Sequence, residues 1–380
     1  MRILVVIYEF PPVGGGGGRA AQDICRGLAE RGHEVMVLTA HLKGLNRQEG
    51  IDGYQVIRVP SARREAFKAG LLAMGGFILA AIPAGLRLVH SWQPDVIHVH
   101  FAVPSGPVGW ALSRYSGVPY VLTAHLGDVP GGVPEKTGRW FRWIYPLTPP
   151  LWKRAAQVVA VSEHTRQLAF KHYPVDIRVI PNGVDLHLLH PGEIRVNSPP
   201  RIVFAGRLMP QKNPVELVNI LARLADLPWQ CVMMGDGPLM GKVQQAIAGH
   251  GLQDRFVLPG WVTPEEVLAN FARSDLLFMP SLSEGLPVVG VQGLAMGLAI
   301  VGSQAGGLVD LVEQGKNGYL YPVGDADGMA TGLRMLLGNP SALLLARQYS
   351  RRLASKFDLE QVVDAYQQIF EAVRWSKSQK

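Results

Sequence analysis

The sequence Arg2-Ile3-Leu4-Val5-Val6-Ile7, followed by a Pro11-Pro12 turn and five glycines at 14–18, decides the fold. Such an apolar run is typical of a strand that is buried on both faces of a parallel sheet. Residues 19–31 then place apolar or small side chains on one face of a helix. A strand, a glycine loop and a helix in this order form an arrangement that cradles phosphate groups, although a glycine run also suits a flexible lid.

The same alternation continues along the 380 residues, which exceed what one hydrophobic core usually organises. Residues 181–200 are rich in Pro, His and Gly without a period, and they are predicted to be a linker. The pattern predicts the α/β class, with two Rossmann-like doubly wound domains at 1–180 and 201–358 that face each other across a cleft. An amphipathic helix at about 359–376 is expected to pack back on the first domain. Strands are predicted at 2–7, 34–39, 56–59, 96–99, 120–123, 157–161, 201–206, 230–234, 256–258, 276–279 and 299–302.

Basic residues gather in the first half, where residues 1–190 hold 20 Lys and Arg against 13 Asp and Glu. Residues 191–380 hold 17 of each kind, so the net charge of +7 belongs to the first half. This asymmetry indicates that the first half meets an anionic partner, and the alternative is a solvated basic surface. Nucleic acid is a poor partner, because the basic residues are dispersed and lack an aromatic stacking platform.

The cysteines and the amino terminus bear on location. Cys25 and Cys231 fall in different halves and suit neither a disulfide framework nor a metal site. Two reduced core thiols are expected, which indicates the cytoplasm. The opening apolar run at 3–7 is too short for a secretory signal and leads directly into Glu9.

An uncharged run at 69–86 reaches the lower length limit for a membrane-spanning helix. It is flanked by Arg63, Arg64 and Lys68 on one side and by Arg87 on the other. Its four glycines and one proline lower helix propensity and mean hydropathy. Contact with a membrane surface is therefore favoured over spanning, with a buried helix as the alternative.

Glu284 is the first candidate for chemistry. It lies in Ser281-Leu282-Ser283-Glu284-Gly285-Leu286-Pro287, which follows a predicted strand and leads into an apolar helix towards Met296. A carboxylate between the carboxyl end of a strand and the amino end of a helix lies beside unpaired backbone N–H groups. Open α/β sheets bind their ligands at that edge.

Several motifs in order along nearly the whole chain resemble the retaining glycosyltransferases of the GT-B fold, specifically the family four group (glycosyl transferases group 1). Each motif is weak alone, but the order and spacing are specific. The motifs are Pro11-Pro12 with Gly15-Gly16, Gly32-His33-Glu34-Val35, Pro181-Asn182-Gly183-Val184-Asp185, Gly206-Arg207-Leu208 with Lys212, Gly235-Asp236-Gly237-Pro238, residues 281–287, and Gly306-Gly307 with Asn317-Gly318.

The resemblance implies a site for a nucleotide-diphosphate sugar. Arg207 and Lys212 match the pair that grips the diphosphate, and backbone amides around Gly15 and Gly16 add to it. Two fixed cations suit the negative charge that grows on a departing diphosphate, so no divalent metal and no other cofactor are expected. The acidic pair Asp325 and Asp327 is interpreted as a surface turn rather than a metal site.

The resemblance also assigns residues to the sugar and the nucleotide. Glu284 matches the carboxylate that bonds hydroxyls of the donor sugar, with the amides of Gly285 and Leu286 alongside. The carboxylate that holds the ribose in this family comes eight residues later, where this chain has Gln292. A glutamine loses the charge-assisted bonds to a diol, which puts the usual ribose contact in doubt.

In the first half, His125 matches the active-site histidine that contacts the transferred sugar, and Asp128 is expected to line the same mouth as a sugar or acceptor contact. His98 and His100 alternate on a predicted strand. Without a third ligand at a suitable spacing, they are interpreted as cleft or core histidines rather than as a metal site.

The predicted function is a retaining, metal-independent hexosyltransferase that moves a sugar from a nucleotide-sugar to a hydroxyl acceptor. A lipid-linked or cell-envelope glycan acceptor is predicted, with peripheral contact to an anionic membrane surface on the cytoplasmic side, because the first half carries both the basic excess and the apolar run. The alternatives are a non-catalytic sugar- or lipid-binding relative and a nucleotide-sugar epimerase of the same fold. A nicotinamide or flavin oxidoreductase is disfavoured, because the second strand ends at Thr39-Ala40-His41 without the acidic residue that would hold a ribose.

Overall fold

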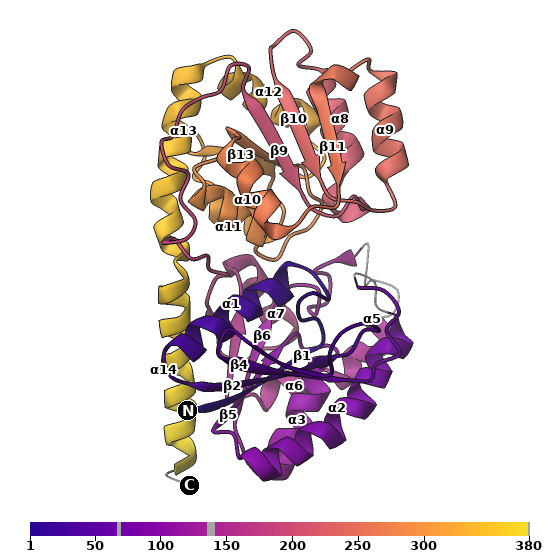
Figure 1. Cartoon of the computed structure of the whole chain (residues 1–380), viewed down its shortest axis with the longest axis vertical. Helices are drawn as coiled ribbons and strands as arrows, with labels where there is room; N and C mark the ends of the chain where they lie inside the picture. Colours follow the sequence, from indigo (N-terminus) through magenta and orange to yellow (C-terminus); the bar gives the residue numbers. More distant parts are fainter. Residues whose placement is uncertain (67–69, 135–140, 379–380) are drawn as a thin grey trace. The chain divides into compact units, whose positions relative to one another are not determined.

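The computed structural model describes residues 1–66, 70–134 and 141–378. The chain forms two compact units, one of Met1–Gly183 with Leu359–Lys380 and the other of Val184–Asp358. The expected linker at 181–200 is thus divided, with its first three residues in the first unit and the rest in the second. Each unit contains its own sheet with helices packed against it (Figure 1). The expectation of a cleft between the two domains stays a prediction.

The first unit is built on an eight-stranded sheet in the order β3-β4-β2-β1-β5-β6-β7-β8, parallel except for the antiparallel edge pair β3 and β4. The order β4-β2-β1-β5-β6-β7 is that of a Rossmann fold, with the switch point between β1 and β5. The strands are β1 (Arg2–Ile7), β2 (Glu34–Ala40), β3 (Gln48–Ile51), β4 (Tyr54–Val59), β5 (Val96–His100), β6 (Tyr120–Ala124), β7 (Gln157–Ala160) and β8 (Ile177–Val179).

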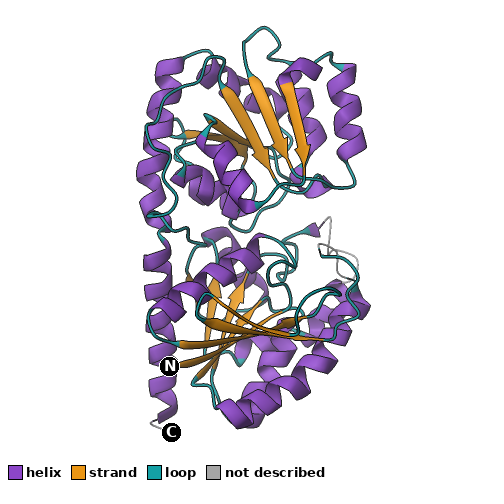
Figure 2. Ribbon diagram, in the orientation of Figure 1, coloured by secondary structure: helices purple, strands orange, loops and turns teal. Residues whose placement is uncertain are grey.

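Helices cover both faces of this sheet (Figure 2). One face packs on α2, α3, α6 and α7, and the other packs on α1 and α14, because inward side chains alternate along strands buried on both sides. The helices and 3-10 turns of the unit are α1 (Gly16–Glu30), α2 (Leu71–Trp92), α3 (Ser105–Ser116), α5 (Phe141–Ile144), η1 (Tyr145–Leu147), α6 (Pro149–Lys153), α7 (Glu163–His172) and α14 (Leu359–Ser378).

The carboxyl-terminal helix α14 completes the first unit, as its amphipathic pattern predicts. Val362, Tyr366 and Phe370 are buried in the same cluster as Ile3 and Val5 of β1. The helix α1 lies directly against α14, and a Cβ added at Gly27 would lie 2.7 Å from Cγ2 of Val363. The absence of a side chain at Gly27 therefore permits the close approach of the two helices.

The second unit contains a six-stranded parallel sheet in the order β11-β10-β9-β12-β13-β14, again with a Rossmann switch point, here between β9 and β12. Its strands are β9 (Arg201–Ala205), β10 (Gln230–Met234), β11 (Phe256–Gly260), β12 (Leu276–Met279), β13 (Ala299–Ser303) and β14 (Gly318–Tyr321). Its helices and 3-10 turns are η2 (Pro210–Lys212), α8 (Pro214–Ala222), α9 (Met240–Gly249), η3 (Gln253–Arg255), α10 (Pro264–Ala272), α11 (Val288–Ala295), η4 (Gly306–Leu311), α12 (Ala326–Leu337), α13 (Pro340–Leu353) and η5 (Ala354–Phe357).

Two details of the predicted elements were wrong. The glycine run is not a loop throughout, since Gly15 is the N-cap of α1 and Gly16 begins the helix. The strands β3, β8 and β14 were missed. Cys25 and Cys231 are both buried and free, in the cores of different units.

The apolar run is largely a helix, α2, although Lys68 and Ala69 lie outside the described residues. Phe77, Ala81 and Val89 pack one face of α2 into the core of the first unit. The outer face exposes 88% of Leu72 and 78% of Leu79. Within the described ranges, α2 alone is long and apolar enough to cross a membrane by length and composition.

Candidate functional site

Two loops meet at the carboxyl edge of the second sheet because β9 and β12 are neighbours. The loop after β9 holds Arg207 and Lys212, and the loop after β12 holds Glu284. Gln211 ties them together: its backbone carbonyl accepts from the amide of Leu282 at 2.8 Å, and its side-chain amide donates to the carbonyl of Ser283 at 3.0 Å. Residues 72 positions apart in sequence are thus held together at one edge of the sheet.

Glu284 and Lys212 form an ion pair at the centre of this edge. Lys212 Nζ lies 2.6 Å from Glu284 Oε1, and the two side chains are only 17% and 5% exposed. A lysine and a carboxylate held this closely in a partly dry site fix each other's orientation. The pair therefore presents a fixed anion and a fixed cation to whatever binds at the switch point.

Glycines fix the backbone around Glu284. The amide of Gly307 donates to the Glu284 carbonyl at 3.0 Å, and a Cβ added at Gly306 would lie 1.8 Å from that carbonyl oxygen. Gly306 also has a φ of 55°, in the left-handed region. The Gly306-Gly307 motif thus serves close backbone packing against the Glu284 loop.

A second glycine motif supports the Arg207 loop. A Cβ added at Gly235 would lie 2.0 Å from the carbonyl oxygen of Gly206, and one added at Gly237 would lie 2.5 Å from that of Leu208. The amide of Leu208 donates to the carbonyl of Asp236 at 2.9 Å. These contacts hold Arg207, which is partly buried, on the loop between the two strand ends.

The other residues predicted for the second unit follow Glu284. Gly285 is partly buried and Leu286 is buried, just before the amino end of α11 at Val288. Gln292 lies in the second turn of α11 and is partly exposed, and its side chain forms no hydrogen bond with any described residue. The side-chain amide of Gln292 is therefore available to a ligand.

In the first unit, the amino end of α1 and His125 lie close together. The N-cap Gly15 is exposed, α1 has no acidic residue in its first turn, and no side chain caps it. A Cβ added at Gly17 would lie 3.2 Å from Nδ1 of His125 and 2.7 Å from Cζ of Phe101. The absence of a side chain at Gly17 thus lets the rings of His125 and Phe101 pack closely against the first turn of α1, whose backbone N–H groups have no partner within the helix.

His125 is held from behind by a second histidine. Its Nε2 lies 3.0 Å from Nδ1 of His100, and its ring packs on Phe101 with a centroid distance of 4.3 Å. Burial lowers the pKa of His125 to about 3 and the pKa of His100 well below its usual value. Both rings are therefore neutral at physiological pH.

Asp128 does not line the mouth of the site. It is 1% exposed, and its two oxygens accept from the backbone amides of Ala102 at 2.7 Å and His125 at 3.0 Å. The buried carboxylate thus joins the loop that follows β5 to the loop that follows β6. The expectation that Asp128 contacts the sugar or the acceptor is wrong for this structure, because the group is buried and engaged by these amides.

His98 belongs to the same buried cluster. Its Nε2 lies 2.9 Å from Oγ1 of Thr123, which in turn lies 3.1 Å from the hydroxyl of Tyr366 on α14. The rings of His98 and His100 have a centroid distance of 4.1 Å. The alternation of the two histidines on one strand indicated a shared face, but nothing in the sequence indicated the bond from His100 to His125.

The acidic pair at 325–327 is structural. Asp325 caps α12 by accepting from the amide of Gly328, and Asp327 pairs with Arg223. Over the ranges that the structure describes, no three His, Cys, Asp or Glu side chains come together in a way that could hold a metal ion.

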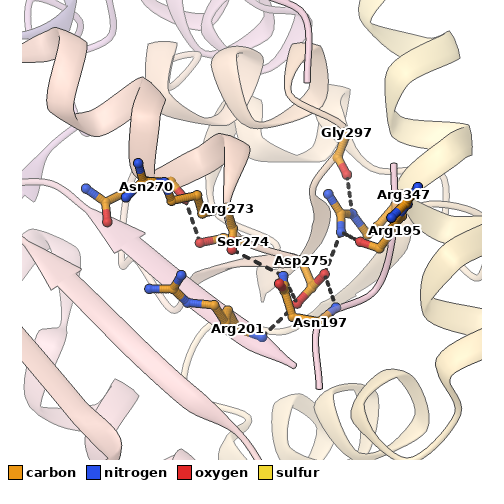
Figure 3. A network of polar contacts seen from close by, with 9 residues as sticks. All are labelled: Arg195, Asn197, Arg201, Asn270, Arg273, Ser274, Asp275, Gly297 and Arg347. Atoms are coloured by element: carbon orange, nitrogen blue, oxygen red, sulfur yellow. Dashed lines mark hydrogen bonds and ion pairs between the residues drawn. The ribbon is translucent and has the colours of Figure 1, made fainter. Parts of the chain in front are cut away.

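A buried polar network lies at the opposite, amino edge of the second sheet (Figure 3). Arg347 pairs with Asp275 at 2.5 Å and donates to the carbonyl of Gly297 at 2.9 Å. The other oxygen of Asp275 accepts from the amide of Arg201 at 2.7 Å and from the side chain of Asn197 at 2.9 Å. Because this network lies away from the ligand-binding edge, it stabilises the unit and is no part of the site.

Comparisons with known proteins agree with this geometry. Residues 14–188 match Glycosyltransferase Family 4, and residues 199–339 match Glycosyl transferases group 1. Over 362 residues the chain is 30% identical to 2-deoxystreptamine glucosyltransferase of Streptomyces kanamyceticus, covering 87% of this chain and 92% of the relative. Over 403 residues it is 28% identical to glycogen synthase of Mycobacterium tuberculosis, covering 100% of this chain and 96% of the relative. The structure of Anabaena HepE in complex with UDP and glucose aligns with a TM-score of 0.78 at 20% identity, covering 98% of this chain and 100% of that one.

Proposed function

Because the chain belongs to the glycosyltransferases of family 4 and group 1, with the GT-B fold, we propose that it transfers a hexose from a nucleotide-diphosphate sugar to a hydroxyl acceptor. The observation that carries this proposal is the buried pair of Lys212 and Glu284 at the switch point of the second sheet. A nucleotide-sugar has a binding partner for each member of this pair: an anionic diphosphate for Lys212 and a hydroxyl-bearing sugar ring for Glu284.

Each residue then has a distinct task. Arg207 and Lys212 bind the diphosphate and stabilise the charge that grows on it as the bond to the sugar breaks. Glu284 accepts from hydroxyls of the donor sugar, with the amides of Gly285 and Leu286 beside it. Gln292 holds the ribose with neutral hydrogen bonds. In the first unit, His125 contacts the transferred sugar, and the amides at Gly15 and Gly16 contribute positive potential.

The proposed reaction retains the anomeric configuration by substitution on the front face. The bond from the anomeric carbon to the diphosphate oxygen breaks while a bond to the acceptor oxygen forms on the same face. The proton of the acceptor hydroxyl passes to an oxygen of the leaving diphosphate. Because the cations of the site carry the charge stabilisation, the reaction proceeds without a divalent metal, and a chelator should leave the rate unchanged.

The acceptor that we propose is an anionic amphiphile such as a lipid-linked sugar. The first half carries the basic excess, and α2 contains no acidic residue and exposes Leu72 and Leu79. Beside α2, a cavity of about 520 Å³ is lined by Arg47 and Arg87, by Arg58, which pairs with Glu49, and by apolar side chains. Guanidinium groups next to an apolar surface suit a phosphate group that carries a hydrocarbon chain. Such an enzyme would work from the cytoplasm at the inner face of the membrane.

The test is mass spectrometry of products from mixed nucleotide-sugars, with a lipid extract in one arm and soluble amino-sugar and glucan acceptors in others. Glu284→Gln should lower kcat at least a hundredfold, because a charged partner of the sugar is lost. Glu193→Gln is the matched control, because Glu193 pairs with Arg195 at an exposed position of the same unit.

Four outcomes would contradict the proposal. Full activity of Glu284→Gln would remove Glu284 from the site, and an inverted product would exclude front-face substitution. Donor binding without turnover on any acceptor would instead support a non-catalytic relative, and consumption of donor without an acceptor product would support an epimerase.

A further inference from the structure

The cluster of His98, His100 and His125 places a buried imidazole behind the histidine that we assign to the sugar. The two ring nitrogens of His125 have distinct surroundings: Nε2 faces Nδ1 of His100 at 3.0 Å, whereas Nδ1 faces Gly17, where an added Cβ would lie 3.2 Å away. In a bond between two neutral imidazoles, one nitrogen donates and the other accepts. The identity of the donor therefore decides whether Nδ1 of His125 carries a proton.

The far nitrogen of His100 decides between the two arrangements. Its Nε2 is buried and has no hydrogen-bond partner among the described residues. If His125 donated to His100, the proton of His100 would lie on this Nε2 as a buried N–H without an acceptor. If His100 donates through Nδ1, its Nε2 is a bare lone pair, and no N–H is orphaned. Orphaned buried N–H groups are the rarer defect in proteins.

The same argument decides which ring nitrogen of His98 carries the proton. Its Nε2 faces Oγ1 of Thr123 at 2.9 Å, and its Nδ1 is buried without a partner. Donation from Nε2 to Thr123 leaves a lone pair, not an N–H, at Nδ1. Because the Thr123 hydroxyl also bonds Tyr366, and the rings of His98 and His100 are in contact, this arrangement fixes the plane against which His100 packs.

We propose that His100 is a positioning residue that holds His125 as the tautomer protonated on Nδ1, so that His125 presents an N–H donor beside the start of α1. The first turn of α1, which packs against His125 at Gly17, contains no acidic residue and no side chain that caps the helix. An Nδ1–H of His125 beside backbone N–H groups suits the hydroxyl and phosphate oxygens of a nucleotide-sugar. The role of this donor in transfer rests on the proposed function, but the tautomer itself does not.

The test reads the tautomer directly from the ¹⁵N chemical shifts of the imidazole rings of the intact protein at neutral pH, with His125 assigned from the spectrum of His125→Gln. We expect a protonated Nδ1 and an unprotonated Nε2 at His125. The opposite pattern in the wild-type protein overturns the proposal. Because this readout needs no turnover, it stands even if no acceptor is found, and a failed proposed function is thus separated from a failed inference.

Substitutions at position 100 extend the test to activity. In His100→Asn, the side-chain amide N–H takes the place of Nδ1–H, so the tautomer should persist and kcat should stay within about threefold of wild type. In His100→Asp, the carboxylate can only accept, so the proton should move to Nε2 of His125. The kcat should then fall roughly 10- to 100-fold with little change in the KM for the donor, as for other residues that orient a site histidine.

Two further variants guard against misfolding. His100→Leu replaces a buried neutral imidazole with an apolar group and should give mixed tautomers at His125. Tyr366→Phe removes a hydroxyl from the same cluster but leaves the bond between His100 and His125, so it should keep the wild-type tautomer. Equal kcat for His100→Asn and His100→Asp, or a switched tautomer in Tyr366→Phe, would overturn the proposal.

Discussion

Gln292 is a residue whose amide the protein leaves available, on α11 eight positions after Glu284. If Gln292 holds the ribose, Gln292→Glu should lower the KM for the donor. A bond to a charged group is worth about 1.5–3 kcal/mol and a neutral one about 1, so a gain of roughly 2- to 30-fold is expected. Steady-state kinetics with the best donor measures it.

Gln245→Glu on α9, at an exposed position of the same unit, is the control for an added negative charge. An unchanged or raised KM in Gln292→Glu, with the control equal to wild type, would mean that the ribose binds elsewhere.

His98 and His100 make the stability of the first unit depend on pH. Both rings are fully buried, which lowers the pKa of His98 to about 3 and that of His100 well below its usual value of about 6.5. Above pH 6.5 the rings are neutral whether folded or unfolded, and the full stability is present. Below it, the unfolded chain binds protons that the folded chain excludes, so the free energy of unfolding falls by roughly 1.4 kcal/mol per pH unit for each ring.

Urea unfolding at pH 7, 6 and 5 tests this dependence. His98→Phe should reduce the slope by about one ring's share, whereas His190→Phe, at an exposed position of the second unit, should not change it. Asp128, whose pKa burial raises, is present in every variant and cancels from the difference. Equal slopes for wild type and His98→Phe would contradict the prediction.

At the residue scale, the sequence indicated Glu284 because its position between a strand and a helix is a local property. It could not indicate that Lys212 pairs with Glu284, because that depends on β9 and β12 being neighbours in the sheet. The error at Asp128 has the same origin. Whether a carboxylate after a strand faces solvent or the backbone of the next loop depends on that neighbouring loop.

Among the elements, α2 packs one face into the core of the first unit and exposes apolar side chains on another face. If that face contacts a membrane, Leu72→Gln with Leu79→Gln should lower binding to anionic vesicles about tenfold or more, because burying one leucine is worth about 1.5–3 kcal/mol. Sedimentation with vesicles at low salt measures this, and added salt should weaken the part due to the arginines.

The matched control is Met335→Gln with Leu345→Gln, which removes two exposed apolar side chains from the second unit. The membrane proposal fails if wild-type protein stays off anionic vesicles at low salt while it glycosylates a soluble acceptor well.

The network of Asp275 and Arg347 joins the start of β12 to α13 and to residues 195–197. Arg347→Met leaves Asp275 buried without its cation and should cost about 3–5 kcal/mol of unfolding free energy. Arg334→Met, which removes the solvent-screened pair with Asp226, should cost much less. Urea unfolding of both variants measures the difference, and equal losses would contradict the assignment of a buried role.

At the element scale, long apolar strands and amphipathic helices could be predicted because their periodicity is local. The missed strands are short, and all three lie at sheet edges, where β3 exists only through its pairing with β4. The start of α1 within the glycine run was missed because glycine has low helix propensity. At Gly17, close packing against His125 and Phe101 outweighs that propensity.

For the whole molecule, the division into two units was predictable from the repeated alternation of strands and helices. The place of the boundary between them, within residues 181–200, was less predictable. Deletion of 359–380 should uncover the face of the first sheet that Val362, Tyr366 and Phe370 bury. We expect loss of the cooperative unfolding transition of the first unit, while the second unit, 184–358, keeps its own. Calorimetry of the full chain, the truncated chain and the isolated second unit tests this. An unchanged first transition in the truncated chain would contradict it.

The position of α14 also sets an order of events during synthesis. Domains usually fold in sequence as they leave the ribosome, the amino-terminal one first. Here the first 183 residues emerge before the segment that covers their sheet, because the whole second unit lies between the two in the chain. The second unit can therefore finish folding while the first still exposes an apolar face. That face stays uncovered until residues 359–380 have emerged.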